Sequence, residues 1–298
     1  MSENKLKTMP RVVCVVVNWN NWQDTAECLR SLQEQSYPDL HVIVVDNGST
    51  NDSVAQLRAK YPWVTMIENG YNAGFPKACN VGVTLALEMN AEFLWLLNND
   101  TTAPSDTAAK LIRKAVEDPQ AGIIGAVLYY MHDPARVQAW GGGHVNLWTG
   151  YNRHFLEPET FGPDSYVTFA SALIRRKVYE DLGGLYEGAF MYFEDSDFGV
   201  RAQQAGWKLR VAEDTAILHK EGASFKAKRN PMIERIVTMA GLSFLDRHSP
   251  VPPISMALFL SSKIMKRLLI CEWAALAAVW KGASDWYRKK PIAVDQKA

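Results

Sequence analysis

The sequence predicts an α/β fold with a mostly parallel sheet flanked by helices, followed by C-terminal amphipathic helices. Short apolar, β-branched runs alternate with segments of helical periodicity through residues 11–128. This alternation is typical of parallel strands joined by right-handed helical crossovers. After Pro250, Pro252 and Pro253 the pattern becomes helical. We therefore expect a first domain over residues 1–250 and a helical tail over residues 251–298.

The first half of the chain supplies most of the expected sheet. Strands buried on both faces appear in a sequence as continuous apolar runs. The runs that predict strands are Arg11–Val17, Leu40–Val45, Val64–Ile67, Phe93–Leu97 and Ile123–Leu128. The segments that predict helices between them are Asp24–Gln35, Asp52–Lys60, Pro76–Met89 and Ser105–Asp118. In such a sheet, ligands bind beyond the carboxyl ends of the strands.

The second half of the chain has a less regular pattern. Residues 129–165 are rich in glycine and aromatic residues and predict loops and short hairpins over the carboxyl edge of the sheet. The further strands expected are Tyr166–Ile174, Leu209–Val211 and Ala216–Leu218, and the further helices are Val178–Asp181 and Asp195–Ala205. A helical pattern then covers Ser255–Lys290.

Composition excludes several classes of protein. The chain has 298 residues with 32 basic and 32 acidic side chains, and this balance argues against a nucleic-acid binder. Its four cysteines form no CxxC pair, which favours a reducing compartment over a zinc site or a disulfide framework. The first residues contain no apolar signal-peptide core, and no uncharged apolar run reaches the roughly 18 residues that span a bilayer. We therefore expect a cytoplasmic protein.

Two polar motifs follow expected strands in the first half. Asp46 ends an apolar run, where its carboxylate can accept a hydrogen bond from a pyrimidine N–H; the alternative is a plain Asx turn. Asn72 and Gly74 lie just before a helix, where glycine lets the backbone approach a ligand. Lys77 on that helix can meet a phosphate. The alternative is a helix start with an exposed lysine.

A third motif, Asn98-Asn99-Asp100, ends the fourth expected strand. Mg²⁺ and Mn²⁺ take oxygen ligands, often one or two carboxylates together with substrate phosphates. Asp100 suits that role, and the alternative is a solvated turn that caps the next helix. His219 follows another apolar run, and its place beyond a strand favours metal binding; the alternative, more common for a lone histidine, is a packed or exposed residue.

The fourth motif is the most specific. Glu194, Asp195 and Asp197 lie within four positions, next to the aromatic run Phe190–Phe193. Crowded carboxylates repel each other, which raises pKa values toward those of useful general bases. The alternative is an acidic helix N-terminus favoured by the helix dipole. The apolar surroundings argue against a merely solvated helix start.

Together these motifs resemble glycosyltransferase family 2, whose members have the GT-A fold and include rhamnosyltransferases and galactofuranosyltransferases. The resemblance runs from about Val12 to Ser224. The motifs that carry it, in order, are Val17-Asn18-Trp19-Asn20, Val45-Asp46-Asn47-Gly48-Ser49, Asn72-Ala73-Gly74-Phe75, Leu97-Asn98-Asn99-Asp100, Ile174-Arg175-Arg176 with Gly183-Gly184, Glu194-Asp195 and His219-Lys220. Each motif is weak alone, but the ordered set is specific.

The resemblance implies a role for each position. Asp195 is the expected general base, and Glu194 and Asp197 are expected to orient the acceptor or hold the helix. Trp140 is also expected at or next to the acceptor site. Asp100 and His219 are expected to hold Mn²⁺ or Mg²⁺. The donor nucleotide-sugar is expected to contact Asn18, Asp46, Asn72, Gly74, Lys77, Asn98 and Asn99. Two positions depart from the family: Asn98 replaces the first acid of the metal-binding DxD motif, and Phe169 lies where a small residue is usual.

The implied reaction is inverting sugar transfer from a nucleotide-diphosphate donor to a hydroxyl of a glycan or lipid-linked acceptor. The motif pattern favours dTDP-L-rhamnose as donor and cell-surface polysaccharide synthesis as context. UDP-hexose or UDP-galactofuranose transfer, and a non-catalytic glycan-binding or scaffold role, remain alternatives. A nucleotidyltransferase or a nicotinamide dehydrogenase would need a glycine-rich loop after the first strand, where this chain has Asn18–Trp22.

The tail gives a separate expectation. Its apolar positions Leu260, Ile264, Leu268, Cys271 and Ala275 are flanked by the basic residues Lys263, Lys266, Arg267, Lys281, Arg288, Lys289 and Lys290. A basic amphipathic helix can lie in an anionic membrane leaflet. The sequence leaves two readings open, a peripheral contact with the inner face of the cell membrane and a packed or partner-binding helix.

Overall fold

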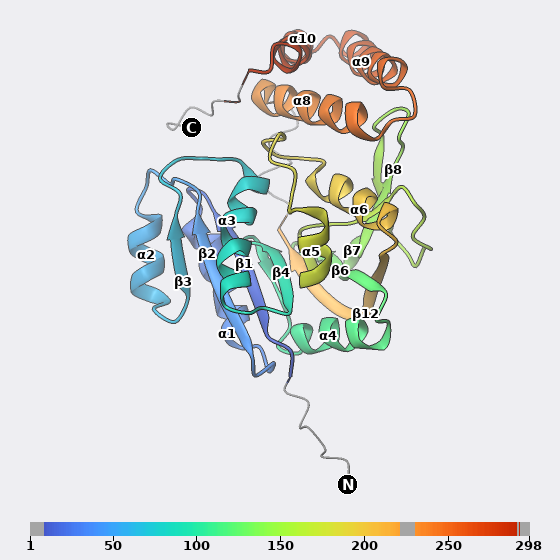
Figure 1. Ribbon diagram of the computed structural model, residues 1–298. Coiled ribbons are helices and arrows are strands. Elements are labelled where there is room, and N and C mark those ends of the chain that lie inside the picture. Colours follow the sequence, from blue (N-terminus) through green and yellow to red (C-terminus); the bar gives the residue numbers. More distant parts are fainter. Residues whose placement is uncertain (1–8, 221–229, 291, 293–298) are drawn as a thin grey trace.

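A mixed β-sheet forms the centre of the protein (Figure 1), in a computed structural model that describes residues 9–220, 230–290 and 292. Within those residues the sheet has nine strands in the order β3-β2-β1-β4-β11-β6-β12-β5, with β7 beside β6. The strands are β1 (Val12–Asn18), β2 (Leu40–Asp46), β3 (Thr65–Glu68), β4 (Phe93–Asn98), β5 (Thr101–Thr102), β6 (Ala121–Tyr130), β7 (Asp133–Trp140), β11 (Ser171–Arg175) and β12 (Lys208–His219).

Strand direction divides the sheet. The strands β3, β2, β1 and β4 are all parallel, as the alternating pattern predicts. Strand β11 then runs antiparallel to both β4 and β6, while β6 and β12 are parallel to each other. The carboxyl ends of β1, β2, β4, β6 and β12 therefore meet at one edge, which is where a ligand site is expected.

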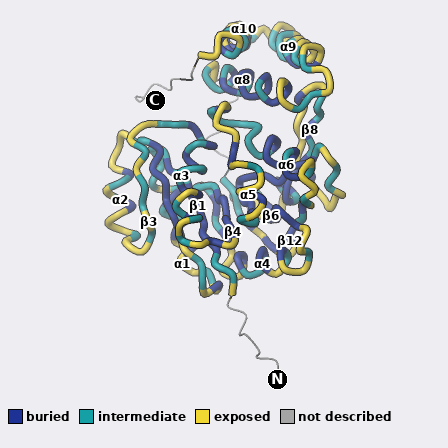
Figure 2. Tube along the Cα trace, viewed as in Figure 1, coloured by how far each residue is buried: buried dark blue, intermediate teal, exposed yellow. Residues whose placement is uncertain are grey.

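Helices cover both faces of the sheet. Side chains along β1 alternate between two apolar clusters: Cys14 packs with α1 (Trp22–Gln33), α2 (Ser53–Lys60) and α4 (Thr107–Glu117). Val15 faces the other way. It packs in the cluster of α3 (Phe75–Glu88), α5 (Arg176–Leu182) and α6 (Glu194–Gln204). Figure 2 shows the buried strands between these two helical layers, so the apolar runs are buried on both sides.

Two strand predictions are wrong in detail. The run expected over Tyr166–Ile174 divides into β10 (Ser165–Val167) and β11, because a turn in which the Ser171 N–H donates to the Thr168 carbonyl separates them. Strand β10 joins β8 (Gly142–Val145) and β9 (Asn152–His154) in a separate small sheet. Conversely, the runs at 209–211 and 216–218 are one strand, β12, with a bulge between Ala212 and Ile217.

Three helices form a layer beyond the second face, at the top of Figure 1: α8 (Pro231–His248), α9 (Pro252–Leu269) and α10 (Trp273–Tyr287). The single helical pattern expected over Ser255–Lys290 is broken at Cys271, whose φ of 53° is left-handed. Helix α8, which the sequence pattern did not reveal, packs against both α9 and α10. In the described part of the chain, none of the helices is both long and apolar enough to span a bilayer.

Candidate active site

A pocket of about 520 Å³ opens at the carboxyl edge of the sheet. Its floor lies at the ends of β1, β4 and β12, and its walls come from the turn before β11 and the start of α6. Seven of the predicted site residues line it: Asn72, Asn98, Asn99, Asp100, Glu194, Asp195 and His219. The fold therefore brings the third and fourth motifs and His219 together, although they are separated by about a hundred residues.

Asp100 and His219 form a close pair in this pocket. The Oδ1 atom of Asp100 lies 3.1 Å from Nε2 of His219, and the Asn98 amide nitrogen lies 3.5 Å from the same ring nitrogen. Strand β5 positions the pair, since Thr101 pairs with His219 in the sheet. Although burial raises the pKa of Asp100, its hydrogen bond with His219 and the charges of His219 and Lys220 hold that pKa below the ordinary value.

Gln138 fixes the other side of the imidazole. Its Oε1 atom lies 2.8 Å from Nδ1 of His219, which favours the ring form that donates from Nδ1. A neutral ring of this form would present the lone pair of Nε2 to the carboxylate of Asp100. Two acceptors so close repel each other unless a proton or a cation lies between them, so the pair fits either an ion pair with a protonated imidazole or a divalent metal. Among the described residues no group of three or more histidine, cysteine or acidic side chains gathers around a possible ion.

Glu194 and Asp195 face the same pocket from the first turn of α6. Burial, together with repulsion from Asp195, raises the pKa of Glu194 to about 8. Burial also raises the pKa of Asp195, to about 6, although hydrogen bonds from Ser196 oppose the shift. The Oε2 atom of Glu194 is buried and has no hydrogen-bond partner. The two pKa shifts favour an ionised Asp195 beside a protonated Glu194 near neutral pH.

The backbone just before this acidic pair is strained. Tyr192 and Phe193 both have left-handed φ values, 73° and 64°, which are uncommon for residues with a side chain. The Phe190 carbonyl oxygen accepts a hydrogen bond from the Phe75 N–H at 2.8 Å. A Cβ atom on Gly74 would lie 2.5 Å from that oxygen, so glycine is required for the contact. Gly74 therefore shapes the pocket by letting the 190–193 segment approach α3.

A series of buried hydrogen bonds between polar side chains supports the pocket floor. The Asn18 amide donates to Asp46 at 2.8 Å, and its oxygen accepts from the Thr25 hydroxyl, which in turn accepts from Asn99. Both oxygens of Asp46 also accept bonds from Ser49. Asp46 is 2% exposed, and neither it nor Asn18 is among the lining side chains. Direct contact of these two residues with a nucleobase stays a prediction.

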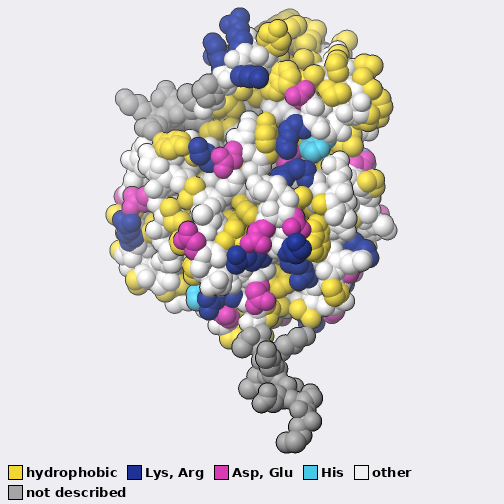
Figure 3. Space-filling model, in the orientation of Figure 1, with side chains coloured by type: hydrophobic (Ala, Val, Ile, Leu, Met, Phe, Trp, Pro, Cys, Tyr) yellow, Lys and Arg dark blue, Asp and Glu magenta, His cyan; other side chains and the backbone are white. Residues whose placement is uncertain are grey.

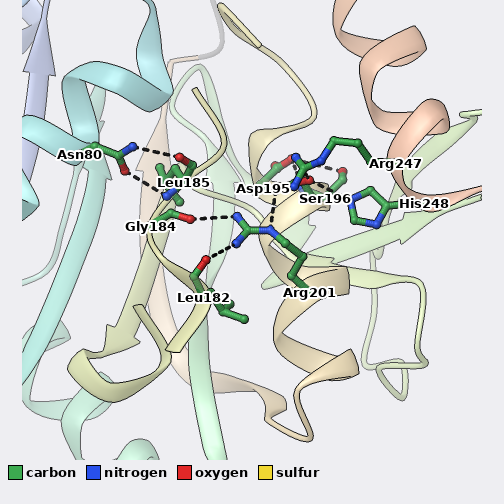
Figure 4. A network of polar contacts seen from close by, with 10 residues as sticks. Asn80, Leu182, Gly184, Leu185, Asp195, Ser196, Arg201, Arg247 and His248 are labelled. Carbon is green, nitrogen blue, oxygen red and sulfur yellow. Dashed lines mark hydrogen bonds and ion pairs between the residues drawn. The ribbon is translucent and has the colours of Figure 1, made fainter. Parts of the chain in front are cut away.

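Asp197, the third acid of the motif, is not among the residues that line the pocket. Figure 4 shows the side chains of Arg201, Arg247 and His248 gathered beside Asp195 and Ser196 at the start of α6. The carboxylate of Asp197 contacts Arg201 at 2.8 Å, Arg247 at 2.5 Å and His248 at 2.7 Å. Arg201 in turn donates to the carbonyls of Leu182 and Gly184. Burial raises the pKa of Asp197, but the bond with His248 and the charges of Arg201 and Arg247 lower it below its ordinary value. Of its two expected roles, this geometry matches support of the helix.

Two other expected residues lie outside the pocket. Lys77 lines a second cavity of about 1060 Å³, between the start of α3 and the helices α8 and α10. Trp140 ends β7, and its indole nitrogen is buried without a hydrogen-bond partner. Trp140 is not a lining residue. Their expected contacts with the donor and the acceptor also stay predictions.

Sequence reasoning missed several residues that line the pocket. Gln138 falls in a segment expected to be loops, and nothing in its local sequence marks it. Asn47, whose amide donates to Asn72 at 2.9 Å, follows Asp46 directly and could have been included with that motif. Trp19 lies in a motif that the sequence singled out, and its buried indole N–H has no partner. An unpaired donor inside a polar pocket is a candidate contact for a ligand.

Comparison with known proteins gives a family match. The model of "Glycosyl transferase family 2" matches residues 13–183, more than half of the chain. The N-acetylglucosaminyl-diphospho-decaprenol L-rhamnosyltransferase of Mycobacterium tuberculosis is 26% identical over 234 residues, which cover 70% of this chain and 76% of the relative. The dTDP-rhamnosyl transferase RfbF of Shigella flexneri is 23% identical over 243 residues, covering 80% of this chain and 75% of the relative.

A solved structure supports the same fold. The mannosyltransferase PcManGT from Pyrobaculum calidifontis, in complex with GDP-Man and Mn²⁺, superposes with a TM-score of 0.60 at 20% identity. The match covers 96% of this chain and 77% of that protein. The predicted α/β fold of the GT-A type, with helices at its C-terminal end, is thereby confirmed.

Proposed function

Because the chain belongs to glycosyl transferase family 2, we propose that the 520 Å³ pocket binds a nucleotide-diphosphate sugar and transfers the sugar, with inversion, to an acceptor hydroxyl. One observation carries the proposal. A carboxylate with a raised pKa, Asp195, and an acid–histidine pair, Asp100 and His219, line one pocket at the carboxyl edge of the sheet. This arrangement supplies a base on one wall and a site for the donor diphosphate on another.

Asp195 acts as the general base. Its ionised carboxylate takes the proton from the acceptor hydroxyl while that oxygen forms a bond to the anomeric carbon of the sugar. The bond from the anomeric carbon to the diphosphate oxygen breaks in the same step, and the nucleoside diphosphate leaves with the electron pair. Attack from the side opposite the leaving group inverts the anomeric configuration. Glu194, kept protonated by burial and by its neighbour, does not compete for the proton at neutral pH.

Asp100 and His219 would hold Mn²⁺ or Mg²⁺, completed by oxygens of the donor diphosphate. When bound, such an ion neutralises the charge that develops on the leaving diphosphate. Gln138 orients the imidazole toward Asp100 through its 2.8 Å contact with Nδ1. Because only two protein ligands are in reach among the described residues, we expect metal and nucleotide to bind together.

dTDP-L-rhamnose is the donor that the relatives favour. Both relatives described above are named as rhamnosyltransferases, and one is named for dTDP-rhamnose. Asn72 lines the pocket wall, and the unpaired indole of Trp19 offers a donor. UDP-hexose and UDP-galactofuranose remain the alternatives, because no contact in the pocket distinguishes the bases.

The acceptor we propose is a glycan or a lipid-linked sugar used in cell-surface polysaccharide synthesis, at the cytoplasmic side of the membrane. The name of the Mycobacterium tuberculosis relative includes a lipid diphosphate that carries N-acetylglucosamine. A non-catalytic glycan-binding role is the second candidate. The raised pKa of Asp195 argues against it, since a binding protein has no use for a buried base beside a metal-binding pair.

Turnover of candidate donors tests the proposal. The purified protein is incubated with dTDP-L-rhamnose, UDP-galactose or UDP-galactofuranose and Mn²⁺, and release of nucleoside diphosphate is measured with and without an acceptor. We expect release from one donor, abolished by chelation and reduced about 10²–10⁴-fold in Asp195→Asn. Asp106→Asn, an exposed carboxylate just before α4 that does not line the pocket, is the matched control. Absence of release from every donor, with nucleotide bound, would favour the non-catalytic role.

A further inference from the structure

The outward face of α9 is apolar, which is the reverse of a helix on an ordinary water-exposed surface. Ile254, Leu258 and Met265 are 53%, 47% and 58% exposed, and their spacing places them on one face of the helix. Leu268 and Leu269 continue this row to the end of α9 and are also exposed. A run of exposed large apolar side chains marks a surface that binds something other than water.

Two of the three cations of α9, Lys263 and Arg267, point inward instead. The Lys263 ammonium lies 2.6 Å from one oxygen of Glu234, and the Arg267 guanidinium lies 2.5 Å from the other. Glu234 is a buried residue of α8. Lys263 and Arg267 therefore do not flank the outward apolar face, because both are used to fix α9 on α8. This inner ion-pair network holds the apolar face outward.

Helix α10 adds an aromatic row beside that face. Trp273, Trp280 and Tyr287 follow each other at intervals of seven residues, so they share one side of the helix. They are 64%, 59% and 82% exposed. Tryptophan and tyrosine have an apolar ring with a polar atom, and they are enriched where hydrocarbon meets water. This row favours a lipid headgroup region as the partner.

The exposed charges of α9, α10 and the turns that flank them are all positive. Within residues 249–290 the exposed charged side chains are Lys266, Lys281, Arg288, Lys289 and Lys290. The two acids of the same segment turn inward: Glu272 pairs with Arg267, and Asp285 pairs with Arg235. Figure 3 shows hydrophobic side chains gathered over α9, with basic side chains beside them near α10. A second copy of this face would bring like charges together, whereas an anionic lipid surface would neutralise them.

We propose that α9 and α10 dock the protein on an anionic lipid bilayer, lying in the headgroup region with their apolar and aromatic rows turned to the lipid. The contact is peripheral, of the kind made by helices that combine an apolar face with basic residues. It is independent of the proposed reaction. If the acceptor is lipid-linked, docking also brings it near the pocket, since the cavity beneath α10 and the pocket share Asn72 as a lining residue.

Vesicle flotation of the full chain tests this contact without any substrate. The probes are phosphatidylcholine vesicles with and without about 30% phosphatidylglycerol, an anionic content high enough for basic residues to respond. We expect wild type to float with the anionic vesicles and to be released by high salt. Leu258→Ser/Trp273→Ser/Trp280→Ser should lower the bound fraction at least about ten-fold. Lys281→Glu/Arg288→Glu should lower the bound fraction only with the anionic vesicles.

Trp63→Ser, an exposed tryptophan between α2 and β3, is the matched control and should float like wild type. Circular dichroism and the thermal midpoint of each variant establish that it is folded, and the replaced side chains are all largely exposed. Wild type that stays in solution with every vesicle overturns the proposal. Equal flotation of wild type and the triple variant also overturns the proposal. Sedimentation that shows a wild-type dimer and a monomeric triple variant, with neither bound to vesicles, would assign the face to a second copy.

Discussion

The Nε2 atom of His248, the last residue of α8, lies 2.7 Å from Oδ1 of Asp197 in the first turn of α6. Asp197 follows Asp195 by two residues, so a helix of the C-terminal layer holds the start of the helix that carries the proposed base. The rings of Phe193 and Phe244 add an apolar contact between the same two segments, with 5.2 Å between centroids. The C-terminal layer therefore supports the active site as well as the surface above it.

Replacing Asp197 should strongly destabilise the fold. Asp197→Asn leaves the charges of Arg201 and Arg247 without their common carboxylate and His248 without its ring contact, and breaking a buried pair in this way typically costs about 3–5 kcal/mol. Urea unfolding at pH 7 measures the loss. Asp39→Asn is the matched control, because Asp39 also pairs with an arginine and a histidine but is partly exposed. We expect a loss below about 1 kcal/mol for that variant; equal losses would contradict the role assigned to Asp197.

The contribution of Asp197 should also depend on pH. Since the folded-state pKa of Asp197 is lowered, its stabilising effect is complete above the unfolded value, about 3.9, and disappears as the pH falls through the folded value. The difference in unfolding free energy between wild type and Asp197→Asn should therefore be constant from pH 5 to 7 and shrink below pH 4. A difference that persists at pH 2 would point to packing instead of charge.

The ionisation of Asp195 should determine how kcat/KM falls at low pH. A general base must be ionised, and burial raises the pKa of Asp195 to about 6. We therefore expect kcat/KM to fall as the pH drops below about 6, and Asp195→Asn to lose about 10²–10⁴-fold in kcat with donor binding retained. Initial rates over pH 5–9, with calorimetric titration of the nucleotide, measure both effects. A variant that keeps wild-type turnover would assign the base elsewhere.

Glu194 should reduce stability at neutral and alkaline pH. Its pKa is raised to about 8 by burial and by Asp195, so folding disfavours its ionised form. The stability of wild type should fall relative to Glu194→Gln as the pH rises from about 4.3, the unfolded value, to about 8. Thermal midpoints of the two proteins at pH 5 and pH 8.5 test this. The variant should melt higher at pH 8.5, with the gap smaller at pH 5, and a reversed order would contradict the assignment.

The local sequence pattern was sufficient to predict much of the sheet. The runs at β1, β2 and β4 are apolar on both faces and end in polar residues, so both the strands and the polar edge could be read from the sequence. The division between β10 and β11 could not, because it depends on distant partners: β10 pairs with β8, whereas β11 pairs with β4 and β6. The break at Cys271 was hidden for a similar reason, since apolar residues continue through it.

Only part of the candidate site could be predicted from the sequence, because some of its contacts join distant segments. Asp100, Asp195 and His219 follow strands or begin a helix, so their positions could be inferred from local sequence. Gln138 reaches His219 across 81 residues from a segment with no recognisable motif. The inward turn of Lys263 and Arg267 depends on Glu234, which belongs to a helix that the sequence pattern did not reveal. Contacts between distant segments decide such features.

Gln138 should act on metal affinity through His219. Gln138→Leu removes the acceptor that orients the imidazole, and loss of such a partner typically lowers metal affinity about 10–100-fold. Electron paramagnetic resonance of free Mn²⁺, titrated in the presence of the nucleotide, measures this affinity. Gln120→Leu, at the surface before β6, is the control and should leave it unchanged. Unaltered affinity in Gln138→Leu would remove Gln138 from the proposed site.

Calorimetric titration of wild type and Asp100→Ala with dTDP, UDP and GDP, each with and without Mn²⁺, tests the central claim most directly. We predict that one nucleotide binds wild type in a metal-dependent way, and that Asp100→Ala loses the metal-dependent part. At about 100 times its dissociation constant that nucleotide should stabilise the fold by about 2.7 kcal/mol. Failure of all three nucleotides to bind wild type with Mn²⁺ present would contradict the assignment of this pocket as a nucleotide-sugar site.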